Sequence, residues 1–207
     1  MRGAALSLPI MSTTLLRQTE SAPMPHRFTV EDFHLMCEVG LLDDDKRYEL
    51  LEGEIIEMLP PGNLHSSHVD RAHAEIFDRL RRKYHLRNQG NVQVSDVSEP
   101  LPDLAILRHS PDEYSTAAPT AKDILLLIEV ADSSLAHDRD RKARIYGRAG
   151  VPEYWIVDTR GRQVLVFRKP RRTGYGEMKM HAPGGKLSAL KVPELSLAVD
   201  DLLVPRK

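Results

Sequence analysis

The chain has 207 residues, enough for one domain with its own hydrophobic core. Hydrophobic residues make up 41% of it and charged residues 29%, as in ordinary globular proteins, and the formal net charge is -1. This balance argues against a wholly disordered chain and against a uniformly basic nucleic-acid-binding protein, although a local basic surface fits within a neutral total.

The first 26 residues are expected to form a disordered leader, because a stretch rich in Ser, Thr and Pro cannot bury enough surface to fold. A single domain should then cover residues 27–207. The sequence contains no run of roughly 20 apolar residues that would span a bilayer, so we expect no membrane partner and a cytoplasmic protein. The single cysteine, Cys37, excludes an internal disulfide and is interpreted as a small buried hydrophobe.

Helix and hairpin signals open the expected domain. Thr29, with Asp32 three residues later, predicts a helix N-cap, and this helix should end near Gly40. A β-hairpin should follow over residues 47–58. Apolar residues at helical spacing predict an amphipathic helix over residues 65–84.

Strands and a further helix are expected in the second half of the chain. The run Ile124–Ile128 is apolar without alternation, which is typical of a central strand covered on both faces. The polar segment 108–123 should be a surface loop. The remaining expected elements are strands over 91–97, 103–107 and 124–130, a helix over 138–150 and a second hairpin over 153–168.

A carboxylate at the end of an apolar strand gives the first clue to function. Glu129 follows five apolar residues, so its charge should lie where water is scarce and should need a cation or hydrogen-bond donors. Lys142 is the candidate cation, because it shares the predicted inward helix face with Ile145 and Tyr146. Asp138, one turn earlier, either holds this ammonium or forms only a surface pair with it.

Asp103 opens a second apolar strand in the same way. Two acids at adjacent strand ends can hold one Mg²⁺ ion, which prefers oxygen ligands and keeps several waters. Such an ion activates water and offsets the charge that develops on a phosphodiester, while a nearby ammonium stabilises the transition state. Asp103 and Glu129 are therefore the expected metal ligands, and Lys142 is the expected positive catalytic group.

These residues, in this order, resemble the PD-(D/E)xK nuclease superfamily, specifically its bacterial putative restriction endonuclease family. The resemblance covers roughly Phe28 to Phe167 and is carried by Tyr48–Ile55, His65, Pro102–Leu107, Ile128–Val130, Asp138 to Lys142 to Tyr146, and Ala149–Asp158. It implies an α/β, restriction-endonuclease-like core, with a mixed central sheet flanked by helices and an N-terminal helix and hairpin. It also implies a DNA endonuclease that uses Mg²⁺, with Mn²⁺ as an alternative, and, by analogy, a homodimer, since cutting both strands needs two centres.

The chain departs from the superfamily and family patterns in two places. Where family members often have Ser-Pro after the Glu-Val pair, this chain has Asp132-Ser133-Ser134. Two residues after Glu129 the standard motif has lysine, whereas this chain has Ala131, and the resemblance implies that Lys142 replaces it. The family also carries an acid and a histidine at the positions of Glu49 and His65, which would complete the metal shell or orient the water. The alternatives are an exposed hairpin residue for Glu49 and a helix cap for His65.

Two readings of function stay open at this point. In the first, an active endonuclease contacts phosphates through arginines, with the candidates Arg79, Arg81, Arg82, Arg139 and Arg141. In the second, a catalytically inactive nucleic-acid-binding or assembly module has kept the fold, since fold alone does not establish activity. Three aromatic residues are assigned to packing: Tyr146, Tyr154 and Trp155.

Overall fold

The computed structural model describes residues 24–80 and 83–205. Residues 1–23 of the expected leader lie outside the described residues, as do Arg81 and Arg82. None of the helices in the described ranges is long and apolar enough to cross a membrane.

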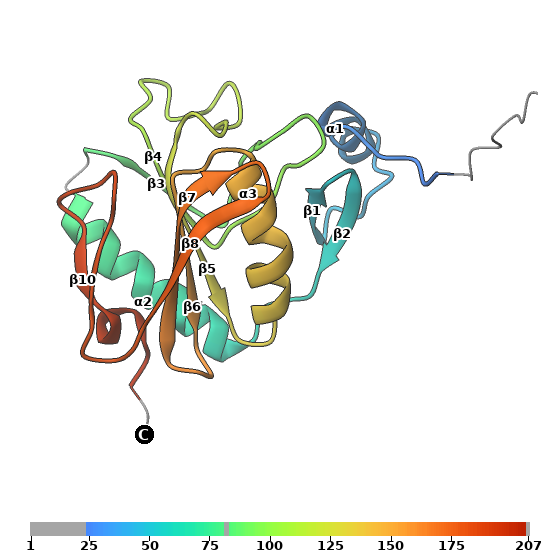
Figure 1. Ribbon diagram of the computed structural model, residues 1–207. Helices are drawn as coiled ribbons and strands as arrows, with labels where there is room; N and C mark the ends of the chain where they lie inside the picture. Colours follow the sequence, from blue (N-terminus) through green and yellow to red (C-terminus); the bar gives the residue numbers. More distant parts are fainter. Residues whose placement is uncertain (1–23, 81–82, 206–207) are drawn as a thin grey trace, which may run out of the picture.

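A six-stranded sheet forms the centre of the molecule (Figure 1). Strands β5 and β6 pair in parallel and every other neighbouring pair is antiparallel, so the sheet is mixed, as the resemblance implies. All eight residues of β5 are buried, as expected of a central strand covered on both faces. In sheet order the strands are β3 (His85–Asn88), β4 (Leu104–Leu107), β5 (Ile124–Ala131), β6 (Glu153–Asp158), β7 (Gln163–Arg171) and β8 (Gly174–His181).

Helices cover both faces of this sheet (Figure 1). Helix α2 (Asn63–Leu80) packs Val69, Ala72 and Ile76 against one face, in a core that also holds side chains of β4 to β7. On the other face lie a π-helical segment, η1 (His137–Lys142), and helix α3 (Ala143–Arg148). Strand alternation sends successive side chains into these two layers.

The N-terminal elements lie at the side of the sheet (Figure 1). Helix α1 (Val30–Glu38) begins with the predicted capping box, in which Thr29 and Asp32 bond reciprocally. Strands β1 (Arg47–Leu51) and β2 (Glu54–Met58) form the predicted hairpin as a separate two-stranded sheet.

The C-terminal residues complete the core on the α2 side. Strands β9 (Lys186–Ser188) and β10 (Ser196–Ala198) pair with each other and lead into a 3-10 helix, η2 (Val199–Leu202). Several apolar side chains of this region are buried in the same core as α2: Leu187, Leu195, Leu197, Val199, Leu202 and Leu203.

Two expectations from the sequence are wrong, and some strands of the structure were not predicted. Residues 91–97 form isolated bridges and a turn instead of a strand, because Val94 N–H bonds back to the Ser98 carbonyl within the same loop. Strand β8 was not expected, since an edge strand with one exposed face lacks a strong apolar pattern. Cys37 is exposed, because α1 buries only Val30 and Phe33.

Helix α3 approaches the start of β8 at Gly147. A Cβ atom built there would lie 2.2 Å from the carbonyl carbon of Gly174. Gly→Ala in a helix ordinarily stabilises by up to about 1 kcal/mol. Here we expect Gly147→Ala to lower the free energy of unfolding by about 1–3 kcal/mol, because the backbones must move apart.

Urea unfolding of the purified variant measures this effect. Gly62→Ala is the matched control, since a Cβ there has nothing within 4 Å. Equal stabilities of the two variants would contradict the close packing of α3 on β8.

Candidate active site

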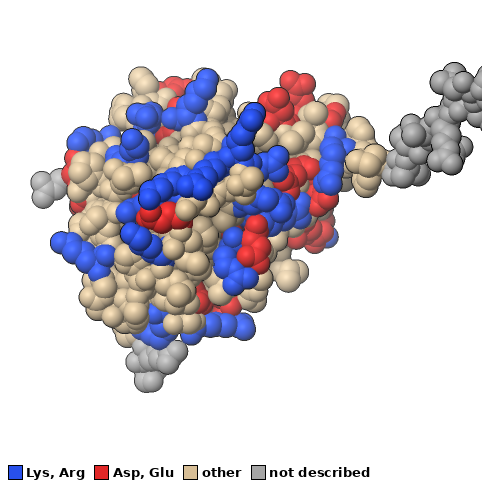
Figure 2. Space-filling view, viewed as in Figure 1, with Lys and Arg blue, Asp and Glu red and all other residues tan. Residues whose placement is uncertain are grey.

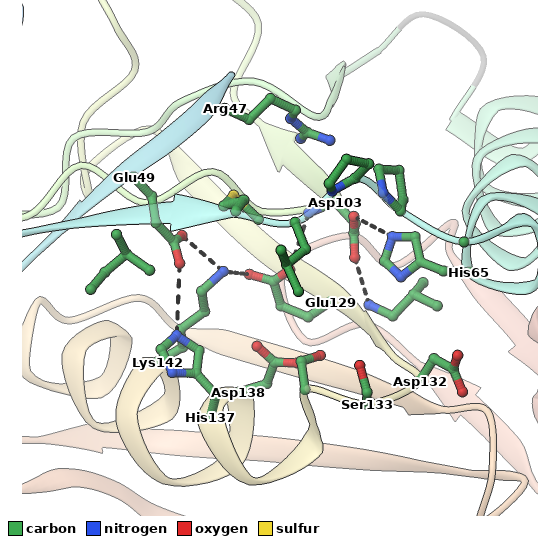
Figure 3. A pocket seen from close by; sticks show the side chains of 18 residues that line it. Arg47, Glu49, His65, Asp103, Glu129, Asp132, Ser133, His137, Asp138 and Lys142 are labelled. Carbon is green, nitrogen blue, oxygen red and sulfur yellow. Dashed lines mark hydrogen bonds and ion pairs between the residues drawn. The ribbon is translucent and has the colours of Figure 1, made fainter. Parts of the chain in front are cut away.

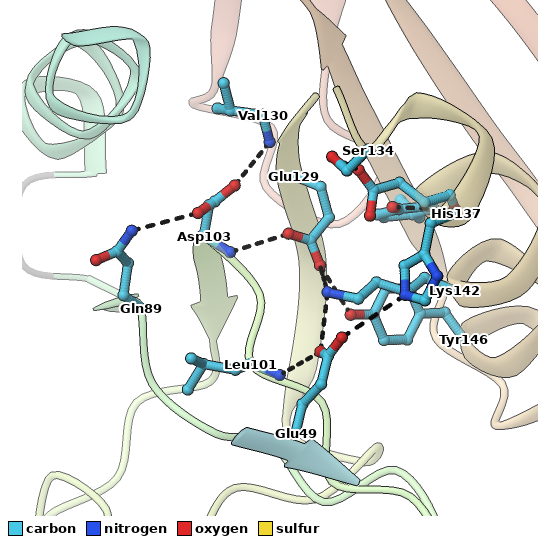
Figure 4. Close-up of polar contacts among 12 residues, drawn as sticks. Glu49, Gln89, Leu101, Asp103, Glu129, Val130, Ser134, His137, Lys142 and Tyr146 are labelled. Carbon is cyan, nitrogen blue, oxygen red and sulfur yellow. Dashed lines mark hydrogen bonds and ion pairs between the residues drawn. The ribbon is translucent and has the colours of Figure 1, made fainter. Parts of the chain in front are cut away.

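The candidate site lies where β4 begins and β5 ends. Leu104 pairs with Ile128, so the antiparallel register places Asp103, just before β4, beside Glu129. The Val130 amide donates to Asp103 Oδ2 at 2.8 Å, and the Asp103 amide donates to Glu129 Oε2 at 3.3 Å (Figure 4). Backbone groups of the sheet therefore fix the positions of both carboxylates.

Lys142 reaches these carboxylates from the helix on that face of the sheet. Its ammonium lies 3.0 Å from Glu129 Oε1 and 2.9 Å from Glu49 Oε2, and only 2% of the residue is exposed. The structure thus brings together Lys142 and Glu129, as the helical spacing predicts. Neither alternative for Asp138 holds. It is buried and so is not part of a surface pair, and its carboxylate accepts a hydrogen bond from Ser134 Oγ at 2.6 Å in place of a bond from the ammonium.

Glu49 links the hairpin to the site. It is 2% exposed, so it is not an exposed hairpin residue. Besides Lys142, its carboxylate accepts a hydrogen bond from the Leu101 amide at 3.2 Å and lies 3.7 Å from His137 Nε2. The ion pair between Glu49 and Lys142 was not predicted from the sequence, because no local pattern reveals that β1 packs against η1.

The π-helical turn explains why two residues of η1 face Glu49. His137 and Lys142 are five residues apart and would point in different directions on an α-helix. In a π-helix the bond from residue i+5 to residue i widens the turn, as in the bond from the Ala143 amide to the Asp138 carbonyl. This wider turn places both side chains on the cavity side, which a 3.6-residue period does not predict.

His65, in the first turn of α2, forms a hydrogen bond with the carboxylate oxygen of Asp103 that the Val130 amide does not contact. Its Nε2 lies 3.1 Å from Asp103 Oδ1, and Gln89 Nε2 donates to the same oxygen at 3.3 Å. The hydrogen bond to Asp103 raises the pKa of His65, although burial opposes this shift. His65 therefore contacts the acid of the site instead of only capping its helix.

The three aromatic residues that were assigned to packing do not all have the same role in the structure. Tyr154 and Trp155 are fully buried, as expected for packing residues. Tyr146 is also buried, but its hydroxyl donates to Glu129 Oε1 at 3.0 Å. Its place one turn after Lys142 on the inward face was the available signal for this polar role.

The two acids that share Lys142 have pKa shifts in opposite directions. Burial raises the pKa of Glu129 well above its usual value, and Lys142 opposes this only in part because Asp103, Asp138 and Glu49 add negative charge nearby. Burial also raises the pKa of Glu49, but the charge of Lys142 and hydrogen bonds from His137, Lys142 and Leu101 outweigh it and bring the pKa to about 2. Glu49 is thus the more firmly ionised partner.

Lys142 remains protonated in this environment. Burial lowers the pKa of its ammonium, but the negative charges of Glu129, Glu49 and Asp138 outweigh burial and raise the pKa above its ordinary value. At neutral pH the side chain can therefore donate hydrogen bonds and offset negative charge, but it cannot accept a proton.

These side chains line an open cavity of about 330 Å³ (Figure 3). Among the described residues that line it, five are acids and two are Lys or Arg: Glu49, Asp103, Glu129, Asp132, Asp138, Lys142 and Arg47. The excess of carboxylates favours binding of a cation.

A divalent ion with few protein ligands fits this donor set. Within the described ranges, no group of three or more His, Cys, Asp or Glu side chains is already arranged to hold a metal ion. Mg²⁺ is commonly held by one or two carboxylates and keeps several waters, so it does not require such a group. Asp103 and Glu129 are the residues that could hold it.

The arginines expected to contact phosphate are engaged with protein groups where the structure describes them. Arg79 pairs with Glu75 and Asp201, Arg139 with Asp140, and Arg141 with Glu54. On the face seen in Figure 2, which carries β7, β8 and α3, Lys and Arg side chains form a band with acids beside it. Arg79, Arg139 and Arg141 could contact phosphate only by leaving their present partners.

Comparison with known proteins agrees with this fold. The family model described as Uma2, putative restriction endonuclease, matches residues 30–200. Among solved structures, the chain is similar to one described as a putative nuclease belonging to DUF820 from Anabaena variabilis, with a TM-score of 0.68 and 19% identity over 84% of this chain and 97% of that chain. At this identity the likeness shows the fold alone. No curated protein matches the chain significantly.

The pKa of Glu49 gives a pH-dependent prediction for the metal-free protein. A carboxylate whose pKa falls from 4.5 to about 2 on folding stabilises the fold above pH 4.5, and this stabilisation is lost as the pH falls toward 2. We expect Glu49→Gln to lower the free energy of unfolding at pH 7 by about 2–3 kcal/mol. The difference from the wild type should shrink below pH 4.5.

Denaturant unfolding in EDTA across this pH range measures the difference. Glu57→Gln, on the same hairpin and half exposed, is the control and should have little effect at any pH. A loss for Glu49→Gln that does not change with pH would show that the charge of Glu49 is not what stabilises the fold.

Proposed function

The chain belongs to the Uma2 family, described as putative restriction endonuclease, and on this premise we propose that it is a metal-dependent endonuclease that hydrolyses phosphodiester bonds in DNA. One observation supports the proposal above all others. Asp103, Glu129 and Lys142 come from three separate segments and meet in one open cavity with an excess of carboxylates.

Asp103 and Glu129 would hold the ion, with Mg²⁺ as the expected metal and Mn²⁺ as its substitute. A bound divalent ion supplies Lewis acidity and offsets negative charge on a phosphodiester. The main-chain bonds that fix Asp103 and Glu129 would keep both carboxylates oriented toward the ion before substrate arrives.

Lys142 would act as a positive group and not as a base. Its ammonium is held protonated by the surrounding carboxylates, so it can stabilise negative charge as it develops or orient the attacking water. Glu49 holds the ammonium independently of Glu129. If Glu129 also served as a ligand of an ion, Lys142 would keep Glu49 as an anionic partner and so keep its position.

Cleavage of supercoiled plasmid tests the proposal. We expect the wild type to nick and linearise plasmid with Mg²⁺ or Mn²⁺ and to be inactive in EDTA. Asp103→Asn and Lys142→Met should each lower the rate by about 100-fold or more, because each removes a charge that acts on the reacting phosphate. Lys179→Met, at an exposed position on β8, should leave the rate unchanged.

Circular dichroism of the variants separates lost activity from lost structure, and Asp103→Asn keeps side-chain size if Lys142→Met proves unstable. Wild-type protein that binds plasmid without cutting it would favour the catalytically inactive module. Equal rates for the wild type and folded Asp103→Asn would reject this site.

We also propose that the protein works as a homodimer, since one centre per chain cuts one strand at a time. Size-exclusion chromatography with light scattering should give twice the chain mass of 23.4 kDa at micromolar concentration. A single-chain mass throughout this range would reject the dimer without affecting the assignment of the cavity.

A further inference from the structure

Arg47 lies at the same cavity but has no role in the site described so far. It is the first residue of β1, and strand alternation places it on the same side of the hairpin as Glu49. Its side chain is partly buried and lines the cavity with Asp103 and Glu129 (Figure 3).

The guanidinium of Arg47 has no protein partner among the described residues: no hydrogen bond or ion pair of 4 Å or less engages it. The adjacent Lys46 differs, because its ammonium lies 2.9 Å from Glu57. Glu49, two residues further on, directs one carboxylate oxygen to Lys142 and the Leu101 amide, and its other oxygen lies 3.7 Å from His137 Nε2.

The surroundings of Arg47 explain why it is unpaired. Met58 lies opposite it in the hairpin, and the adjoining cavity wall is formed by apolar or small residues that offer no side-chain acceptor: Ile56, Leu59, Pro60, Pro61 and Gly62. Such a wall partly excludes water from the guanidinium, which strengthens its attraction for an anion. The planar guanidinium donates two parallel hydrogen bonds and so suits a phosphate group.

We propose that Arg47 binds a phosphate of the nucleic-acid strand that enters this cavity and thereby positions the strand against Asp103 and Glu129. The nature of the ligand rests on the proposed function. The carboxylates of the cavity repel a phosphodiester, so a strand needs an attractive contact beside them. Arg47 supplies that contact from the hairpin, beside the wall of apolar and small residues.

DNA binding without turnover tests this role. The parent protein carries Asp103→Asn, which prevents cleavage and removes one negative charge from the cavity. Fluorescence anisotropy with a labelled short duplex in Mg²⁺, over a series of NaCl concentrations, compares the parent with added Arg47→Gln, Arg47→Lys or Lys46→Gln. The two glutamine variants each remove one positive charge, from adjacent positions, so they differ only in the position of the charge that is removed.

We expect Arg47→Gln to weaken binding by about tenfold or more and to reduce the slope of log affinity against log salt by about 0.9, the value for one phosphate contact. Arg47→Lys should keep the slope but lose part of the affinity, since an ammonium lacks the paired donors. Lys46→Gln should match the parent, because the charge of Lys46 is already paired with Glu57.

Equal effects of Arg47→Gln and Lys46→Gln would overturn the inference, and so would a parent that binds no DNA. Plasmid cleavage by proteins with intact Asp103 separates this inference from the proposed function. If the wild type never cuts but binding still depends on Arg47, the nuclease proposal fails and the phosphate contact stands. If the wild type cuts and Arg47→Gln cuts with the same KM, the phosphate contact fails and the nuclease proposal stands.

Discussion

The buried ammonium of Lys142, shared between Glu129 and Glu49, is the interaction on which the rest of the site depends. It joins the helical layer, the central sheet and the N-terminal hairpin at one point. Charges removed from water are costly unless each has a partner in good geometry, so none of these elements can shift alone. The remaining carboxylates are left in excess around the cavity, which favours binding of a cation there.

The sequence alone predicted those features of the site that depend on residues of a single helix or strand. Glu129 after five apolar residues indicated a buried acid, and helical spacing indicated that Lys142 lies on the inward face. The capping box at Thr29 likewise depends on residues only three positions apart. The sequence did not predict contacts between segments that lie far apart along the chain. The contact of Glu49 with Lys142 depends on how the hairpin docks, and the polar role of Tyr146 depends on the depth of Glu129.

In the proposed site the lysine comes from the helix and not from the strand that carries its acid. In the standard superfamily motif the lysine shares a strand with its acid, whereas here that position is Ala131, which is fully buried. The ammonium comes from a different layer of the structure, so strand geometry alone does not fix it. Glu49 meets this need by holding the ammonium from the hairpin, and this contact makes a hairpin outside the central sheet part of the site.

The π-helical turn between His137 and Lys142 has a consequence for what changes this helix can tolerate. Within the wide turn Lys142 is held by Glu129 and Glu49, and downstream Gly147 is fixed against the backbone of Gly174. The widened turn takes up one more residue than an ordinary helical turn and so sets the rotational phase between the two segments. Ordinary winding of the same residues would rotate one segment by about 100° relative to the other. Packing of α3 on the sheet and delivery of the ammonium would then become mutually exclusive, so substitutions that restore ordinary winding are excluded as strictly as loss of the lysine itself.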